Sequence, residues 1–143
     1  MNVFSKLQQM NILLIDDDEW IRDSMRLFFE SEGCHLLALE TAEEGIATLE
    51  KQACDIIISD YRLPGMDGIE FFKKIRNSSQ ASKKILITAY GSAGVVSKAK
   101  KAGVHECIEK PFTTDTIESS LLRLLTINDD QPAMRIGKGG KDY

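Results

Sequence analysis

Five short, mostly apolar runs alternate along this chain with longer segments of mixed polarity. The runs cover residues 11–15, 35–39, 55–59, 84–88 and 106–109. Their length and their content of β-branched residues predict β-strands. The first, third and fourth runs are almost continuously apolar, which is typical of central strands buried on both faces. Charged residues flank the second run, which favours an edge position for it.

The segments between these runs repeat their apolar residues at helical spacing. After the first run, positions 21, 25, 28 and 29 are apolar, and the pattern stops at Gly33, a suitable C-terminal glycine. Thr41 and Glu44 have the spacing of a capping box, and apolar residues at 42, 46, 49 and 53 predict a second helix after it. Apolar residues at 69, 72 and 75, at 95, 99 and 102, and at 117, 121, 124 and 125 predict three more helices.

This alternation predicts an α/β fold. Parallel strands need crossover connections, so five strand and helix pairs indicate a five-stranded parallel sheet with helices on both faces. A length of 143 residues fits one domain with a single well-buried core. We expect an N-terminal extension at residues 1–9, the folded domain at 10–125 and a flexible C-terminal tail at 126–143.

The composition narrows the class of protein. No apolar run approaches the roughly 20 residues of a membrane span, and the first residues lack the pattern of a signal peptide. Cys34, Cys54 and Cys107 form no CxxC pair, which predicts reduced core thiols in a cytoplasmic protein. The net charge is -4 without a concentrated basic stretch, so direct nucleic-acid binding has little support.

Polar residues gather where the predicted strands end. The carboxyl ends of parallel strands share one edge of the sheet, and ligands bind there, where the strand order reverses. The residues at these ends are Asp16, Asp17, Asp18, Ser59, Asp60, Thr88, Glu109 and Lys110. Clustered carboxylates need a counter-charge, and hard oxygen ligands suit Mg²⁺. An aspartate beside Mg²⁺ can attack a phosphoryl group while the metal, a lysine and a hydroxyl neutralise its oxygens.

Each of these residues also has an ordinary structural interpretation. Asp18, and with it Asp17, could cap the first predicted helix, where anions are favoured. Asp60 could begin an Asx-turn ahead of Pro64-Gly65. Thr88 alone would be a common strand-end residue, and Lys110 alone a solvated one. Their occurrence together at equivalent strand ends favours a functional site.

Four motifs in order, LLIDDD, IIISDYRLPGMDG, ILITAY and ECIEKPF, span most of the chain. With them, the sequence resembles the receiver domain of two-component response regulators, which have the CheY-like fold. The resemblance implies the strand order 2-1-3-4-5. It implies that Asp60 is the phosphoacceptor and that the Mg²⁺ ligands are Asp16, Asp17, Asp60 and the backbone carbonyl of Arg62. It further implies that Thr88 and Lys110 contact the phosphoryl group, and that a cis peptide bond precedes Pro111.

One position departs from the family pattern. Receivers usually carry Tyr or Phe on the fifth strand at the position of Cys107, and that ring turns inward as the switch hydroxyl moves. A thiol cannot make the same large rotamer change, so the usual readout of phosphorylation is not expected here. Tyr90, two residues beyond Thr88, could shield the phosphoryl group or be an ordinary loop residue.

The resemblance implies a phosphorylation-dependent signalling switch of a two-component system or phosphorelay. Its partners would be a sensor histidine kinase or phosphotransfer protein and a downstream protein target, and its only catalysis would be its own phosphorylation and dephosphorylation. A phosphatase or mutase of the haloacid dehalogenase type is the first alternative, but its nucleophile would lie in a DxD-like motif at strand one. A phosphorylation-independent interaction module is the second, and it would be favoured if Asp60 or Lys110 were missing.

Overall fold

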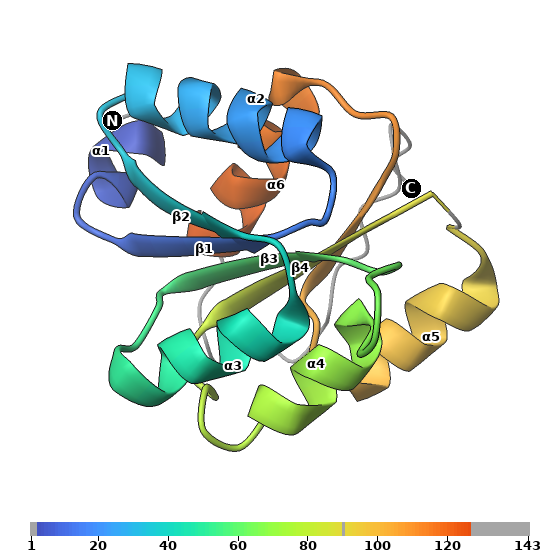
Figure 1. Ribbon diagram of the computed structural model, residues 1–143. Helices are drawn as coiled ribbons and strands as arrows, with labels where there is room; N and C mark the ends of the chain where they lie inside the picture. Colours follow the sequence, from blue (N-terminus) through green and yellow to red (C-terminus); the bar gives the residue numbers. More distant parts are fainter. Residues whose placement is uncertain (1–2, 90, 127–143) are drawn as a thin grey trace.

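The computed structural model of this chain describes residues 3–89 and 91–126 (Figure 1). Its strands are β1 (Asn11–Ile15), β2 (His35–Leu39), β3 (Ile56–Asp60), β4 (Lys83–Thr88) and β5 (Glu106–Glu109). Its helices are α1 (Val3–Leu7), α2 (Glu19–Ser31), α3 (Ala42–Lys51), α4 (Gly68–Ile75), α5 (Ala93–Lys101) and α6 (Thr114–Thr126). Of the tail predicted at 126–143, Thr126 is the last residue of α6 and the rest lies outside the described residues, as does Tyr90.

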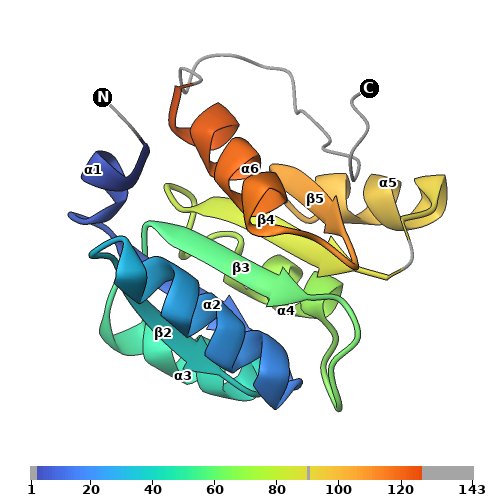
Figure 2. The same ribbon diagram turned by 90° about the horizontal axis from the view of Figure 1, so that it is seen from above.

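The five strands form one parallel sheet in the order β2-β1-β3-β4-β5, as predicted. Figure 2 shows β2 and β5 on opposite sides of β3 and β4, and β1 lies between β2 and β3 in the strand order. β3 begins and ends one residue later than the apolar run indicates: Asp55 hydrogen-bonds to Asn11 ahead of the strand, and the pairing with β4 continues as far as Asp60. Asp60 is therefore the last residue of β3, in register with Ile87 of β4.

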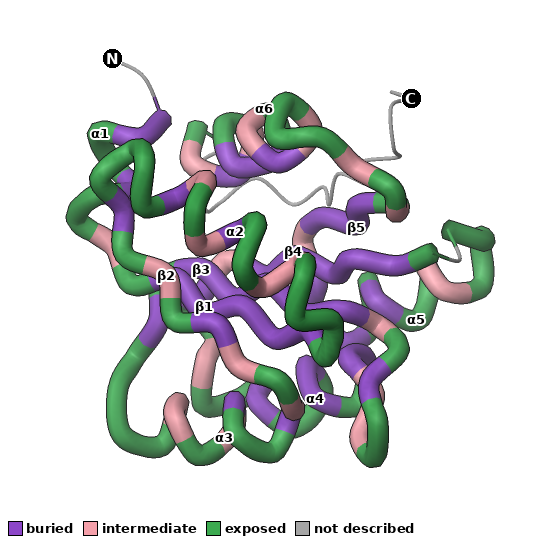
Figure 3. Tube along the Cα trace, turned by 45° about the horizontal axis from the view of Figure 1, so that its top comes forward, coloured by how far each residue is buried: buried purple, intermediate pink, exposed green. Residues whose placement is uncertain are grey.

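Two apolar cores lie on the two faces of the sheet. The helices α1, α2 and α6 cover one face, and α3, α4 and α5 cover the other (Figure 1). The buried residues concentrate along the strands and the inner helix faces, while the outer helix surfaces are exposed (Figure 3). Both faces of the central strands are thus removed from water, which explains their continuous apolar runs.

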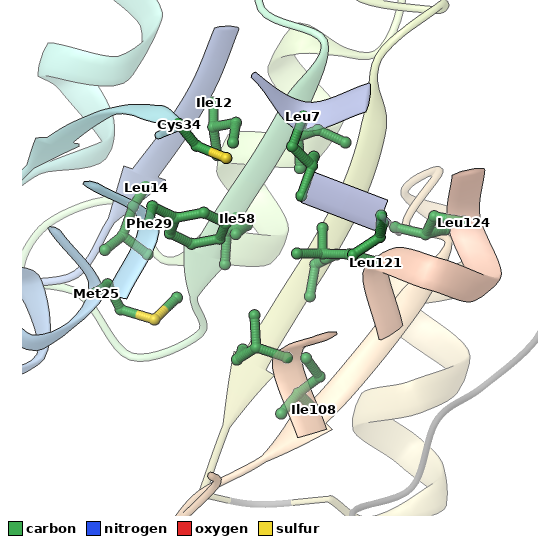
Figure 4. Packing of buried hydrophobic residues seen from close by; sticks show 14 of the residues in the cluster. Leu7, Ile12, Leu14, Met25, Phe29, Cys34, Ile58, Ile108, Leu121 and Leu124 are labelled. Carbon is green, nitrogen blue, oxygen red and sulfur yellow. The ribbon is translucent and has the colours of Figure 1, made fainter. Parts of the chain in front are cut away.

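The extension at residues 1–9 contains a helix, α1, that the sequence pattern does not predict. A five-residue helix is too short to show a periodic apolar face. It nevertheless buries Leu7 in the core, close to Leu121 of α6 (Figure 4). The rings of Phe4 and Phe28 meet edge to face with centroids 5.7 Å apart. The first helix therefore belongs to the folded domain.

The helix ends follow the signals in the sequence. The Thr41 side chain and Glu44 form the predicted capping box at the start of α3. Gly33 follows α2 with a φ of 79°, the left-handed conformation that glycine adopts most easily. Asp18 is the N-cap of α2, and its carboxylate accepts a hydrogen bond from the Trp20 amide at 2.9 Å. No described helix has the length and apolar character needed to span a membrane.

Candidate functional site

Asp60 lies at the carboxyl edge of the sheet, where β3 gives way to a loop. Asp60 is only 5% exposed, although its side chain is ionisable. Backbone bonds fix this exit: the Tyr61 amide donates to the Ile87 carbonyl at 2.8 Å, and the Gly68 amide donates to the Tyr61 carbonyl at 2.8 Å. The carboxylate of Asp60 is therefore held at a rigid strand end.

Two further aspartates converge on Asp60 from the end of β1. Asp16, Asp17 and Asp60 each offer an oxygen within 4.8 Å of the other two. Asp16 is fully buried, whereas Asp17 is exposed. Asp16 Oδ1 accepts a hydrogen bond from the Asp18 amide at 3.0 Å, which turns the side chain inward. This separates the roles within the acidic run: Asp18 caps α2, and the two residues before it face the site.

Lys110 supplies the cation of this cluster from the end of β5. Its Nζ lies 3.2 Å from Asp60 Oδ2 and 3.5 Å from Asp16 Oδ2. The peptide bond between Lys110 and Pro111 is cis, as the resemblance implied. The Lys110 amide donates to the Thr88 carbonyl at 2.8 Å, so β4 holds the backbone that carries the ammonium group.

The charges of these groups are coupled. Burial, and after it the negative charge of Asp16, raises the pKa of Asp60 to about 6, although Lys110 acts in the opposite direction. Burial also raises the pKa of Asp16. The pKa of Lys110 is raised as well, because the attraction of Asp16 and Asp60 outweighs its own burial, which acts to lower it. One ammonium group does not fully compensate the buried carboxylates.

The donor set suits a hard divalent cation. Asp16 Oδ2 is the one buried side-chain oxygen or nitrogen in the described residues that lacks a hydrogen bond of good geometry, and the Lys110 ammonium lies 3.5 Å from it. A lone buried carboxylate oxygen is costly unless it is bonded or coordinated. Lys110 does not fully neutralise the negative charge of the three carboxylates, and one of their oxygens is an orphan without a hydrogen bond. Such a set of oxygen ligands is the kind that Mg²⁺ prefers.

The remaining predicted site residues lie at the same edge. Thr88 is the last residue of β4, is 1% exposed and pairs in register with Glu109. Arg62 follows Asp60 by two positions, and its guanidinium lies 5.5 Å from the centre of the Tyr61 ring. The aromatic contact places its side chain on the surface of the loop. The use of its carbonyl as a ligand stays a prediction.

Two supporting residues were not identified from the sequence. A side chain at Gly68 would collide with the backbone carbonyl oxygen of Asp60, so only glycine lets α4 begin this close to β3. The signal was present as a glycine directly after Asp67, which caps α4 through a box with Glu70. Arg22 donates from Nη1 to the Asp16 carbonyl at 2.9 Å and so fixes the loop after β1. This contact depends on tertiary packing, and no local pattern marks it.

Cys107 lies away from solvent on β5, beside Leu86 in the register of the sheet. It is 4% exposed and belongs to the core under α3, α4 and α5. Burial, and after it the charge of Glu106, raises its pKa to about 12, so the thiol stays protonated and unreactive. The prediction that the three cysteines are buried and unpaired is confirmed for Cys34, Cys54 and Cys107.

The model of the response regulator receiver domain family matches residues 12–122 of this chain. The match covers most of the described residues and all five strands, so the chain belongs to the response regulator receiver domain family. The family and the five-stranded fold predicted from the motifs are both confirmed.

Individual relatives agree with this assignment. The chain is 30% identical over 119 residues to the C4-dicarboxylate transport transcriptional regulatory protein DctD of Pseudomonas aeruginosa, covering 83% of this chain and 26% of that one. It is 28% identical over 119 residues to the sporulation initiation phosphotransferase F of Bacillus subtilis, covering 83% and 96% of the two chains. The chain thus spans about a quarter of the first relative and nearly all of the second.

A solved structure shows the same arrangement of elements. The chemotaxis response regulator CheY4 of Vibrio cholerae superposes with a TM-score of 0.76 at 26% sequence identity. The superposition covers 80% of this chain and 98% of that one. The similarity therefore extends over a whole receiver domain.

Proposed function

We propose that this chain is a phosphorylation-dependent signalling switch that accepts a phosphoryl group on Asp60. The observation that carries the proposal is the convergence of Asp16, Asp17, Asp60 and Lys110 at the carboxyl edge of the sheet. Membership of the receiver family supports it, because this family acts in two-component signalling. A sensor histidine kinase or a phosphotransfer protein supplies the phosphoryl group, and a downstream protein reads the resulting change of surface.

The transfer is a nucleophilic displacement at phosphorus. A carboxylate oxygen of Asp60 attacks the phosphorus of a phosphohistidine, the phosphorus–nitrogen bond breaks, and the imidazole of the donor leaves with the bonding electrons. Lys110, already 3.2 Å from Asp60, stabilises the negative oxygens of the transferred group. The Thr88 hydroxyl, at the end of the neighbouring strand, provides a hydrogen bond to them. Water later attacks the phosphorus, which releases phosphate and restores the carboxylate.

Asp16, Asp17, Asp60 and the carbonyl of Arg62 would hold the Mg²⁺ on which this reaction depends. The metal supplies positive charge for the incoming oxygens and allows several carboxylates to stay ionised together. Asp16 and Asp60 carry raised pKa values in the protein without a metal, which supports a requirement for additional positive charge. The orphan oxygen of Asp16 supports the same role.

Asp16→Asn or Asp17→Asn should each weaken Mg²⁺ binding about tenfold or more, because each removes a charged oxygen ligand. Trp20 is the one tryptophan of the chain and is 77% exposed beside the acidic run, so its fluorescence can follow a Mg²⁺ titration. Asp18→Asn is the matched control, since asparagine caps a helix about as well as aspartate. If all three variants bind Mg²⁺ with the affinity of the wild-type protein, the acidic run serves only as the start of α2.

Mapping of the phosphorylated residue tests the proposed function directly. We expect acetyl phosphate with Mg²⁺ to add one phosphoryl group, which borohydride reduction followed by peptide mass spectrometry places at residue 60. Chelation of the metal should prevent the labelling. A label on His35 or His105, or a label that forms equally well without divalent metal, would contradict the proposal.

A further inference from the structure

The basic residues of this chain are concentrated in one part of the sequence. Residues 71–105 contain seven lysines, one arginine and no aspartate or glutamate, although the whole chain has 18 basic and 22 acidic residues. The remainder is therefore strongly acidic. The eight positive charges are spread over several elements, so no consecutive basic run marks them.

The fold gathers these residues at one edge of the molecule. Each helix runs back from the carboxyl edge of the sheet, so α4 and α5 both end at the amino edge, where β4 begins. Figure 1 shows α4 and α5 on the same face of the sheet. Arg76 Nη1 donates to the carbonyl of Lys101, which joins the ends of the two helices. We name as the basic edge the residues Lys73, Lys74, Arg76, Lys83, Lys98, Lys100 and Lys101, of which all but the half-buried Lys83 are exposed.

Lys84 extends this positive charge into the interior beneath the basic edge. It is 3% exposed, and its Nζ donates to the carbonyls of Ser79 at 2.6 Å and Ser82 at 3.3 Å. Burial, and after it the positive charges of Arg76 and Lys83, lowers the pKa of Lys84 to about 8. This ammonium group therefore has two neutral carbonyls as acceptors and is repelled by the charges of Arg76 and Lys83. An anion at the surface above it would relieve the repulsion.

Helix dipoles account for only part of the arrangement. A positive side chain in the last turn of a helix interacts favourably with the exposed carbonyls, and α4 and α5 have two and three such residues. The helix dipoles do not explain why residues 71–105 contain no carboxylate. They also do not explain the lysines at the start of β4. Glu106, the next acidic residue, is fully buried and paired with Arg123 at 2.8 Å, so it does not screen this surface.

We propose that the basic edge binds an acidic segment of a partner protein. Opposite charges steer such an encounter, and the acidic remainder of the chain repels the same segment from other surfaces, which fixes where it docks. The phosphoacceptor lies at the opposite edge of the sheet, so both sites can be occupied at once. This contact is independent of the proposed chemistry at Asp60.

The chemistry of the edge favours a carboxylate partner over nucleic acid or membrane. Six of its seven residues are lysines, whereas bidentate phosphate recognition favours arginine. Phosphates are also bound by the amide groups of helix N-termini, but this edge presents helix C-termini. The described aromatic residues of the stretch, Phe71 and Phe72, are buried and cannot stack on bases. The large exposed apolar residues of the described chain lie outside this stretch, so it offers no side chain of that kind for insertion into a bilayer.

Binding of a fluorescent oligoglutamate peptide to the full chain tests this proposal, with oligoglutamine as the neutral probe. Anisotropy should show binding of oligoglutamate alone, weakening as salt rises. The variant Lys98→Gln/Lys100→Gln/Lys101→Gln should lower the affinity about tenfold. The matched variant Lys6→Gln/Arg26→Gln/Lys141→Gln removes as many positive charges from outside residues 71–105 and should change the affinity less than about twofold. Thermal unfolding and acetyl phosphate labelling verify that both variants are folded with an intact carboxyl edge.

Parallel titrations with random-sequence duplex DNA and with vesicles of mixed neutral and anionic lipids identify the class of anion. Weaker binding to both than to oligoglutamate supports the proposal. Tighter binding to either would overturn it in favour of a phosphate-bearing partner. Absence of oligoglutamate binding at low salt, or equal losses in the two triple variants, would also overturn it.

Discussion

Asp60→Asn should abolish phosphorylation of this chain by acetyl phosphate or by a cognate kinase. An amide is a poor nucleophile toward phosphorus and leaves one fewer charged oxygen for the metal, so a loss of at least about a hundredfold in rate is expected. No other carboxylate of the described chain lies at the end of β3. Asp16 and Asp17 follow a different strand, β1. Quantitative mass spectrometry of the intact protein measures the result.

The same substitution should stabilise the fold in metal-free buffer at neutral pH. The pKa of Asp60 is raised from 3.8 to about 6, so the folded protein keeps a proton that the unfolded chain has already lost. Stability therefore falls as the pH rises from about 4 through about 6, and the penalty persists at pH 7. Asparagine removes this penalty, from which the attraction of Lys110 is already subtracted, and a gain of about 1 to 2 kcal/mol is expected.

Urea unfolding with and without Mg²⁺ tests whether the buried charge of Asp60 causes this difference in the free energy of unfolding. Mg²⁺ should stabilise the wild-type chain and narrow its difference from the Asn variant, because a bound cation removes the repulsion among the carboxylates. Asp18→Asn is again the matched control, and it should leave both phosphorylation and stability nearly unchanged. A variant at Asp60 that is less stable than wild type at pH 7 would show that the Asp60–Lys110 pair outweighs the cost of burying the carboxylate.

The sheet could be predicted because its signals are local. Apolar runs, the Thr41–Glu44 box and Gly33 each fix an element within a few residues of its position in the chain. The order of the strands came from the resemblance alone, and the structure confirms it. The end of β3 was placed one residue too early, because Asp60 is charged in the sequence but pairs with Ile87 of β4 in the sheet.

The candidate site was predictable as a set of residues but not as a geometry. Topology brings the ends of β1, β3 and β5 together, which explains why Asp16, Asp60 and Lys110 could be named before their distances were known. The orphan oxygen of Asp16 and the close approach of Gly68 to the Asp60 backbone depend on side-chain packing. The basic edge was missed for a related reason: its charges lie on several separate elements and come together only after α4 and α5 fold back to the same edge.

The environment of Cys107 bears on how phosphorylation is read. It belongs to the same apolar core as Leu86, Ala99 and Val104, and only 4% of the residue is exposed. A thiol that is packed and protonated there is a small core residue. Thr88 lies at the boundary between β4 and the loop that leads to α5, with 1% exposure. Of the two positions, only Thr88 is the last residue of its strand, at the same edge of the sheet as Asp60.

Thr88→Ala should therefore uncouple phosphorylation from α5, whereas Cys107→Ala should leave the response intact. A phosphoryl group adds about -1.5 to -2 charge at Asp60, and the Thr88 hydroxyl and Lys110 are drawn toward it, which moves the loop after β4. Amide shifts of α5 with and without beryllofluoride follow this motion: wild type and Cys107→Ala should both show them, and Thr88→Ala should lose most of them. Cys107→Ala should cost about 1 kcal/mol of stability through the small cavity it leaves. Loss of the α5 shifts in Cys107→Ala with their retention in Thr88→Ala would make the thiol the switch element, in place of the hydroxyl.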